Sequence, residues 1–512
     1  MSRQGNYSVV WFKRDLRIDD HQPLLQALQR GPVLCLYIIE PSLWAAPDAA
    51  RQHYDFLIES LRDLYRSLRD AGGRLHLVSG EVTGVLERLY RQSPFGHLYA
   101  HEETGNGLTF ERDRAVARWC RAHAVSWHEI PQFGVVRRLP ARDRWQQRRE
   151  EFMAAPPVAA PAHVPSVVLP WSEPPPPLPA AVGLSDQTVP LRQRGGRQAG
   201  LYVLHEFLSE RSNQYRGGIS SPLSAPTACS RLSPYLAFGC LSLREVEHAT
   251  RSFAERLPAS ASRQRSGLQA FISRLYWHCH FIQKLESEPS LEFENLHRGY
   301  DGLRENDWNS VHFSALTAGR TGWPLVDACV AMLRDCGWIN FRMRAMLVSV
   351  AAYPLWLHWR PVGLWLARQF LDYEPGIHWP QMQMQAGTTG INVARVYNPI
   401  KQARDHDPRG HFVRRWLPHL RQVPDSWLFE PWRMPEELQK RQGLEPGVDI
   451  PEPLVDLEVA TRLAKQKLFA LRAQPEVNAA KAAIIEKHGS RKHHPGRGKK
   501  LSGAPGQMTL DW

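Results

Sequence analysis

VVWFKRDLRIDDHQPL (residues 9–24) opens with four consecutive apolar residues, the pattern of a buried β-strand. Similar short apolar runs predict four further strands, at residues 33–39, 75–78, 97–100 and 126–130. Helical spacing of apolar residues fills the stretches between several of these runs, at residues 52–70, 82–92 and 108–123. Strand–helix alternation predicts a parallel sheet of Rossmann-like α/β type. No G-x-G-x-x-G follows the first strand, so the standard dinucleotide fingerprint is absent.

The rest of the chain divides by composition into three further segments. Residues 131–197 are too rich in proline for regular structure and are expected to form an inter-domain linker. Residues 198–478 show helical periodicity almost throughout, which predicts an all-α domain. Residues 479–512 are basic and nearly devoid of apolar side chains, as in a disordered tail. The fold prediction is therefore an α/β domain over residues 1–130 followed by a helical domain.

Composition limits the partners and the compartment. The formal net charge of +13 favours a polyanionic partner such as nucleic acid, the alternative being a genome that simply prefers arginine codons. The seven cysteines contain no Cys-x-x-Cys, which argues against a disulfide framework and a zinc ribbon. No apolar run approaches the ~18 residues of a membrane span, and the N-terminus lacks a secretion signal. We expect a cytoplasmic monomer without a membrane segment.

Four stretches carry a resemblance to a known family. They are residues 9–24, CSRLSPYLAFGCLSLREV (229–246), TGWPLVDACVAMLRDCGWINFRMRAMLVS (321–349) and RVYNPIKQARDHDPRGHFVRRWLP (395–418). In this order they resemble the N-terminal strand and the FAD-binding segments of the DNA photolyase/cryptochrome family. The resemblance implies a flavoprotein that holds FAD in its helical domain and acts on UV-damaged DNA under blue light.

The resemblance implies a set of FAD-binding residues. Cys229 to Ser233 precede a helical run, where backbone N–H groups, serine hydroxyls and Arg231 suit a pyrophosphate, although an ordinary serine N-cap would look the same. Arg344 and Asp372 match the ion pair beside the flavin ring, and a fixed guanidinium there would stabilise anionic reduced flavin. The complete implied set is Tyr215, Cys229, Ser230, Arg231, Leu232, Ser233, Phe271, Arg274, Trp338, Asn340, Arg344, Asp372, Glu374 and His378.

The positions implied to contact a DNA lesion are partly altered. The stacking tryptophan of the family is present as Trp277, but the carboxylate that reads the lesion is replaced by Arg274. Phe341 stands where the family has an asparagine on the substrate side. The family's G-G-W-Q-W is replaced by PQMQM (380–384), so Met384 takes the place of a second stacking tryptophan.

The family's electron relay and its flavin-facing residue are altered too. Within PQMQM a methionine also replaces the relay tryptophan nearest the flavin, whereas Trp359 matches the middle member and Trp308 the surface member. Trp338, Trp356 and Trp379 are alternative routes, and each can equally be a core residue. His378 stands where photolyases have asparagine opposite the reactive flavin nitrogen. It can be cationic or neutral near pH 7 and could tune the flavin redox state.

Other signals are weaker. His278-Cys279-His280 do not share one helix face, so no metal is predicted, and the cysteines of an iron–sulfur cluster are absent. HEETGNGLTFERD (101–113) does not reproduce a folate-binding loop, and a second antenna chromophore stays unknown. The C-terminal hexapeptide Gln507–Trp512 resembles peptides that bind the replication sliding clamp.

Three functions remain open. The leading hypothesis is light-driven repair of cyclobutane pyrimidine dimers by a deoxyribodipyrimidine photo-lyase, which flips its substrate base out of the duplex. The alternative is a cryptochrome-like photoreceptor with weak or no repair, favoured by Arg274, Phe341 and the lost relay tryptophan. A DNA-binding scaffold with an inactive flavin fold is the third.

Overall fold

The N-terminal domain is a five-stranded parallel sheet in the order β3-β2-β1-β4-β5. The computed structural model describes residues 6–172, 174–391 and 394–489. The strands confirm the prediction within one residue at each end: they are β1 (Ser8–Phe12), β2 (Val33–Ile39), β3 (Leu75–Ser79), β4 (His97–His101) and β5 (Ser126–Ile130). All described pairs are parallel, as in Ser8 with Val33 and Ser8 with His97.

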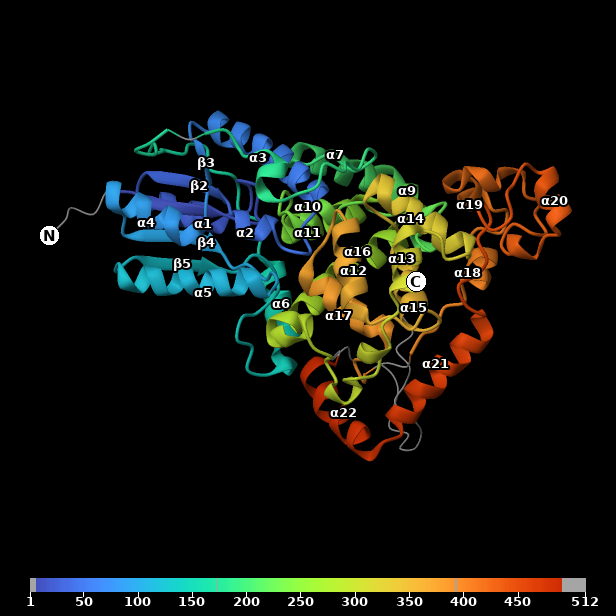
Figure 1. The fold of residues 1–512 in the computed structure, drawn as a ribbon. Helices are drawn as coiled ribbons and strands as arrows, with labels where there is room; N and C mark the ends of the chain where they lie inside the picture. The colour runs from blue at the N-terminus through green and yellow to red at the C-terminus, as the bar shows by residue number, and fades with distance from the viewer. Residues whose placement is uncertain (1–5, 173, 392–393, 490–512) are drawn as a thin grey trace.

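Helices cover both faces of this sheet (Figure 1). The apolar core on one face joins Val10 and Phe12 to α1 (Gln22–Leu28) and α3 (Arg51–Asp70). The core on the other face joins Val9 and Trp11 to α4 (Val82–Gln92) and α5 (Gly107–Ala122). Because both faces are covered, the strands are apolar on both sides, which explains the continuous runs seen in the sequence.

The linker contains one helix that the sequence did not predict. This helix is α6 (Trp145–Ala154), which lies within residues 131–197. Outside the linker, the short α2 (Pro41–Trp44) precedes α3. Helix α6 forms in a stretch of the linker that contains no proline, and it buries Trp145 and Met153. The rest of the linker is largely irregular apart from 3₁₀ turns and an isolated bridge between Val33 and Ser166.

The second domain is helical, as predicted. Its helices are α7 (Arg197–Glu206), which continues through a π-helical turn at Phe207–Arg211, α8 (Ser212–Gly218), α9 (Ala225–Ala228), α10 (Ser233–Ala237), α11 (Leu243–Arg256), α12 (Ser262–Ser287), α13 (Ser310–Ala318), α14 (Pro324–Cys336), α15 (Phe341–Ala352), α16 (Trp359–Gln369), α17 (Pro375–Ala386), α18 (Pro399–His406), α19 (His411–Trp416), α20 (Glu436–Arg441), α21 (Leu457–Arg472) and α22 (Pro475–His488). Helix α22 crosses the expected boundary at residue 479, because the alanine-rich run after Pro475 favours a helix. None of the helices within the described ranges is long and apolar enough to cross a bilayer.

The two domains share a core. Residues of α3 pack in one apolar cluster with residues of α7, α10, α11 and α12. Buried polar contacts reinforce this junction: Arg17 Nη1 donates to the Gly239 carbonyl at 2.9 Å, and Ser242 Oγ donates to Asp20 Oδ2 at 2.6 Å. The relative placement of the domains is therefore fixed by packing, which positions any site formed between them.

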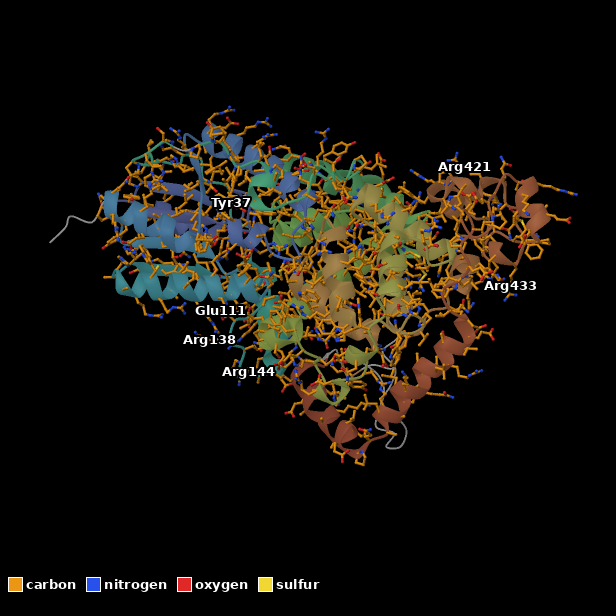
Figure 2. All side chains as sticks on the ribbon, in the orientation of Figure 1. Tyr37, Glu111, Arg138, Arg144, Arg421 and Arg433 are labelled. Atoms are coloured by element: carbon orange, nitrogen blue, oxygen red, sulfur yellow. The ribbon has the colours of Figure 1, made fainter. Side chains whose placement is uncertain are left out.

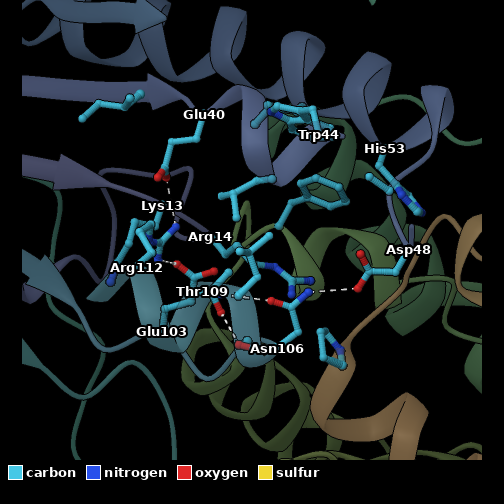
Figure 3. A pocket seen from close by; sticks show the side chains of 18 of the residues that line it. Lys13, Arg14, Glu40, Trp44, Asp48, His53, Glu103, Asn106, Thr109 and Arg112 are labelled. Carbon is cyan, nitrogen blue, oxygen red and sulfur yellow. Dashed lines mark hydrogen bonds and ion pairs between the residues drawn. The ribbon is translucent and has the colours of Figure 1, made fainter. Parts of the chain in front are cut away.

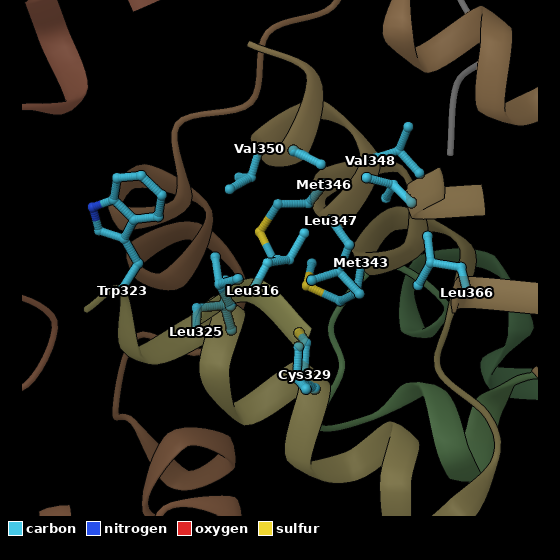
Figure 4. Packing of buried hydrophobic residues seen from close by; sticks show 14 of the residues in the cluster. Leu316, Trp323, Leu325, Cys329, Met343, Met346, Leu347, Val348, Val350 and Leu366 are labelled. Carbon is cyan, nitrogen blue, oxygen red and sulfur yellow. The ribbon is translucent and has the colours of Figure 1, made fainter. Parts of the chain in front are cut away.

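The helical core holds α15 firmly, and the surface carries many exposed arginines. Met343 and Met346 of α15 pack beside Cys329 of α14 (Figure 4). Figure 2 shows exposed side chains such as Arg138, Arg144, Arg421 and Arg433 on the molecular surface. One face of α15 is thus anchored in the core, and its other face is available to line a cavity.

Candidate functional site

A cavity with about 810 Å³ of empty space lies in the helical domain. Its lining comes from α10, α12, α15, α17 and the segment between α16 and α17. The lining residues are Ser233, Leu236, Ala237, His278, Phe341, Arg344, Ala345, Val348, Phe370, Asp372, Tyr373, Glu374, Ile377, His378, Gln381, Met382 and Gln385. We call this space the first cavity.

An ion pair spans one side of the first cavity. The Arg344 guanidinium donates from Nη1 and Nη2 to the two oxygens of Asp372 at 2.9 and 3.0 Å. Its Nε donates to the Ile339 carbonyl at 2.8 Å, and its plane lies over the Phe370 ring. Burial alone would raise the pKa of Asp372, but the charge and hydrogen bonds of Arg344 outweigh it, so the pKa is lowered. The pair is therefore ionised and held in one orientation.

His378 is neutral at physiological pH in this structure. Burial lowers the pKa of its imidazole to about 4, although a hydrogen bond to the Gly363 carbonyl opposes the shift. That bond, 2.9 Å from Nε2, places the proton on Nε2 because a carbonyl can only accept. The sequence left both charge states open, and burial decides in favour of the neutral one.

Two further ionisable groups line the first cavity. Burial raises the pKa of Glu374, whose carboxylate lies 3.3 Å from Arg14 Nη2. Burial also lowers the pKa of His278 to about 3. The buried Nδ1 of His278 has no hydrogen-bond partner among the described residues. An unpaired polar atom in a cavity wall is costly unless a ligand satisfies it, so His278 fits a bound group with polar atoms. The sequence considered His278 only as a metal ligand and missed this position.

The pyrophosphate segment is only partly at the first cavity. Within Cys229–Ser233, only Ser233 lines it. Arg231 points instead to Gln193, with a 3.0 Å bond to Oε1, and stacks 3.8 Å from the centroid of the Trp338 ring. Leu232 is fully buried, and the carbonyls of Cys229 and Ser230 accept hydrogen bonds from Arg211.

Three other predicted cofactor residues are buried in the helical domain. Phe271 and Tyr215 are buried with their ring centroids 5.8 Å apart. Asn340 donates from Nδ2 to the carbonyls of Ile219 and Ser220, while its Oδ1 is buried and has no partner in the described part of the chain. None of these side chains lines the first cavity itself.

The predicted lesion contacts are divided. Phe341 lines the first cavity, whereas Arg274, Trp277 and Met384 do not. Arg274 hydrogen-bonds to the buried hydroxyl of Tyr215. Trp277 packs against His280, with ring centroids 4.9 Å apart.

The aromatic relay has a different start from the one in the family pattern. Met382 lines the first cavity, whereas none of the tryptophans among the described residues does. Behind it, the rings of Trp379 and Trp359 lie 6.0 Å apart, and Trp379 lies 4.9 Å from His378. Trp359 is buried and donates to Asn295 Oδ1 at 2.8 Å.

Trp308 lies near the surface. It is 38% exposed, and its described ring neighbour is Phe313. Of the three alternative tryptophans named from the sequence, Trp379 is therefore the one packed against both Trp359 and a cavity residue.

A second cavity, with about 950 Å³ of empty space, lies where the α/β sheet meets the helical domain (Figure 3). It opens at the carboxyl ends of β1, β2 and β4, the place where α/β sheets bind ligands. Arg112 bonds there to Glu40 and Glu103 at 3.1 and 2.5 Å. Burial raises the pKa of Glu40 to about 7 despite Arg112, and Glu40 Oε2 has no partner among the described residues.

A buried cluster near the second cavity has the composition of a metal site. Asp15, His21 and His101 have ligand atoms within 4.8 Å of one another. Asp15 Oδ2, however, accepts hydrogen bonds from His21 Nε2 and His101 Nδ1 at 2.9 and 2.7 Å. His21 Nδ1 accepts from the Leu24 N–H, so the cluster is explained as an internal hydrogen-bond network.

Comparisons with known proteins agree with this architecture. A model described as DNA photolyase matches residues 8–137, and one described as the FAD binding domain of DNA photolyase matches residues 271–470. A protein named Cryptochrome DASH from Gloeobacter violaceus is 31% identical over 481 residues, which cover 88% of this chain and 93% of that protein. A deoxyribodipyrimidine photo-lyase from Streptomyces griseus is 30% identical over 483 residues, covering 88% and 97%.

Solved structures match nearly the whole chain. A class III photolyase from Agrobacterium tumefaciens superposes with a TM-score of 0.78 at 25% identity, covering 93% of this chain and 99% of that one. A photolyase from Sulfolobus tokodaii, described as holding two FAD molecules, has the same fold, with a TM-score of 0.72 at 24% identity and coverage of 90% and 99%.

Proposed function

We propose, on the premise that this chain belongs to the DNA photolyase/cryptochrome family, that it repairs cyclobutane pyrimidine dimers in DNA under blue light. The relatives include both photolyases and DASH cryptochromes, so the family alone leaves repair and photoreception open. The choice between them depends on the residues around the first cavity.

The observation that carries the proposal is the fixed ion pair in the first cavity. FAD is the cofactor of the helical domain, and the residues present fit it: Arg344 and Asp372 are ionised and oriented, and His278 offers an unpaired nitrogen. Bound FAD supplies the light absorption and the one-electron transfer that dimer splitting needs. Arg344 would stabilise negative charge on the flavin. Because His378 is neutral, it would add no second positive charge there.

Access to DNA is the second requirement. Phe341 replaces the family's asparagine, which favours a photoreceptor, but it lines the first cavity, and we propose that a flipped base stacks on its ring. The net charge of +13 and the exposed arginines supply the attraction to phosphates. Trp277 is the proposed counterpart of the family's stacking tryptophan, and it lies on α12 with its ring next to Phe281.

The test is a repair assay on the purified holoprotein. UV-damaged single- and double-stranded DNA is incubated in blue light or in the dark, and dimers are quantified; (6-4) photoproducts serve as a second substrate. We expect light-dependent loss of cyclobutane dimers and reduced loss with Trp277→Ala. The family's (6-4) branch has paired histidines where this chain has Ile339 and Asn340, so (6-4) lesions should persist.

A cryptochrome-like photoreceptor is the second candidate. It is favoured by Arg274, which is engaged with Tyr215 where repair enzymes have a carboxylate that reads the lesion. Bound FAD that responds to light without any dimer loss would favour this function over repair.

The second cavity is proposed to hold a second chromophore. The Sulfolobus tokodaii structure is described as implying a novel light-harvesting cofactor, and in this chain Glu40 offers an unpaired acceptor for a ligand N–H. Extraction of a second pigment from the native protein, and its loss in Glu40→Ala, would support this assignment.

Two proposals concern electrons and partners. Trp359 and Trp308 are proposed relay members, and a tryptophan route into the first cavity would have to begin at Trp379. The hexapeptide Gln507–Trp512 lies outside the described residues; we keep it as a proposed sliding-clamp peptide. Deleting residues 507–512 should abolish clamp pull-down, and retained binding would contradict the assignment.

A further inference from the structure

Tyr373 stands between the two cavities. It belongs to the segment that joins α16 to α17, and it is a lining residue of both the first and the second cavity. Its backbone is fixed from the α/β domain, because Arg14 Nη2 donates to the Tyr373 carbonyl at 2.9 Å. On the side of the first cavity its ring lies edge-to-face with His378, with the centroids 5.2 Å apart.

The hydroxyl of Tyr373 has a proton acceptor within hydrogen-bonding distance. Its hydroxyl donates to Asp48 Oδ2 at 2.8 Å. Asp48 is buried and lines the second cavity, where Asn106 Nδ2 donates to the same oxygen at 2.9 Å (Figure 3). This places a carboxylate oxygen within the reach required for direct proton transfer.

Such an arrangement matters for electron transfer. A phenol that loses one electron becomes a strong acid, so its oxidation proceeds readily only when a base takes the proton at the same time. Burial and the nearby Asp48 charge raise the pKa of Tyr373 well above its usual value, so the group begins as a neutral phenol. Asp48 therefore supplies what oxidation of this buried side chain requires.

The alternative donor is less well placed. Met382 occupies the cavity wall on the helix that carries the relay position, whereas Trp379 does not line the cavity and lies next to His378. Electron transfer weakens steeply with distance, so a side chain in the cavity wall has the advantage. Among the cavity-lining residues, Tyr373 is the one that combines an oxidisable ring with a hydrogen-bonded base.

We propose that Tyr373 is the electron donor to FAD in the first cavity and that Asp48 accepts its proton. This inference rests on the proposed light-driven function. One electron leaves the Tyr373 phenol for light-excited, oxidised FAD; the phenolic O–H bond breaks and a new O–H bond forms on Asp48. A small-molecule thiol then returns a hydrogen atom to the tyrosyl radical and ends as disulfide, and Asp48 releases its proton to solvent.

The experiment follows the radical rather than repair. FAD-loaded protein with dithiothreitol is illuminated with blue light, and the radical is characterised by time-resolved absorption and by EPR on freeze-trapped samples. We expect a tyrosyl radical that disappears in Tyr373→Phe, which keeps the ring. In Asp48→Asn, which keeps a hydrogen-bond acceptor but cannot hold the proton, radical formation should slow on the order of 100-fold. Tyr65→Phe, an exposed tyrosine of α3, is the matched control and should behave as wild type.

Isotope labelling keeps the test independent of how the variants fold. Wild-type protein grown on ring-deuterated tyrosine should give a narrower EPR spectrum, and a spectrum unchanged by this label would overturn the proposal. Undiminished radical in Tyr373→Phe, or its loss in Trp379→Phe alone, would overturn it as well. Because photoreduction needs no DNA, bound FAD without a tyrosyl radical contradicts only this inference, whereas absence of dimer repair contradicts only the proposed function.

Discussion

Asp372→Asn is the substitution that probes the first cavity most directly. Asparagine keeps the size of the side chain and one acceptor oxygen, but it removes the charge that faces Arg344. The guanidinium then keeps its bond to the Ile339 carbonyl and its contact with Phe370, and loses its ionised partner.

The expected loss is about 2 kcal/mol of unfolding free energy. Removing one member of a buried pair typically costs about 3–5 kcal/mol because the other charge stays buried. Here the Arg344 side chain is 20% exposed, while that of Asp372 is 5% exposed, so solvent reduces the cost of the remaining charge. Asparagine also restores one hydrogen bond, worth about 1 kcal/mol.

The pH dependence has a defined sign. The folded-state pKa of Asp372 is lowered, so its contribution is complete above the unfolded-state pKa of about 3.9 and disappears as the pH falls through the folded value. The difference between wild type and Asp372→Asn should therefore be constant near neutrality and shrink below pH ~4.

The assay is urea unfolding of the FAD-loaded protein, followed by far-UV circular dichroism and by the fluorescence of released flavin. Asp405→Asn is the control, because its pair with Lys401 is exposed on α18, where solvent screens the charges and the pair should contribute little to stability. Equal stability of the two variants, or a difference that grows as the pH falls below 4, would refute the reasoning about this ion pair.

Three more predictions follow from particular contacts. In Gly363→Ala the new Cβ would lie 2.6 Å from the Trp379 ring, so the variant should lose about 1–3 kcal/mol of unfolding free energy in thermal or urea unfolding. The control Gly84→Ala, in α4, has free space around its new Cβ and should not be destabilised. Equal effects of the two substitutions would contradict the packing around Gly363. Because burial raises the pKa of Glu40 to about 7, the unfolding free energy should fall by on the order of 3 kcal/mol as the pH rises from ~4.5 to ~7. Glu40→Gln should flatten this pH dependence in urea titrations at several pH values. His378→Asn should change the lifetimes of the flavin redox states seen by transient absorption. Since His378 is neutral above its pKa of about 4, these lifetimes should not depend on pH between ~6 and ~8 in the wild type. An unchanged lifetime in the variant would show that His378 does not act on the flavin.

The sheet was predictable because its central strands are apolar runs covered on both faces, as at Val9–Phe12. Helix α6 was missed because its ten residues bury only a few side chains and lie among prolines. The part of α22 beyond residue 478 was missed because an exposed alanine-rich helix has little apolar periodicity.

The site was predictable only where the resemblance supplied it. Arg344 and Asp372 are 28 residues apart, and nothing in their local sequence pairs them; the family pattern did so, and the two side chains are in contact. Tyr373 lies between Asp372 and Glu374, which the resemblance places at the cofactor, so its position beside the cofactor could have been predicted from the sequence. Its bond to Asp48 joins residues 325 positions apart, and such a contact is set by how the domains pack rather than by local pattern.

Dimer loss from UV-damaged DNA under blue light, measured with the purified, FAD-loaded protein, decides whether the protein repairs DNA. We expect cyclobutane dimers to disappear in the light, to persist in the dark, and to disappear more slowly with Trp277→Ala. Protein that retains FAD and its light response but leaves the dimers intact in both single- and double-stranded DNA would contradict repair and leave a photoreceptor.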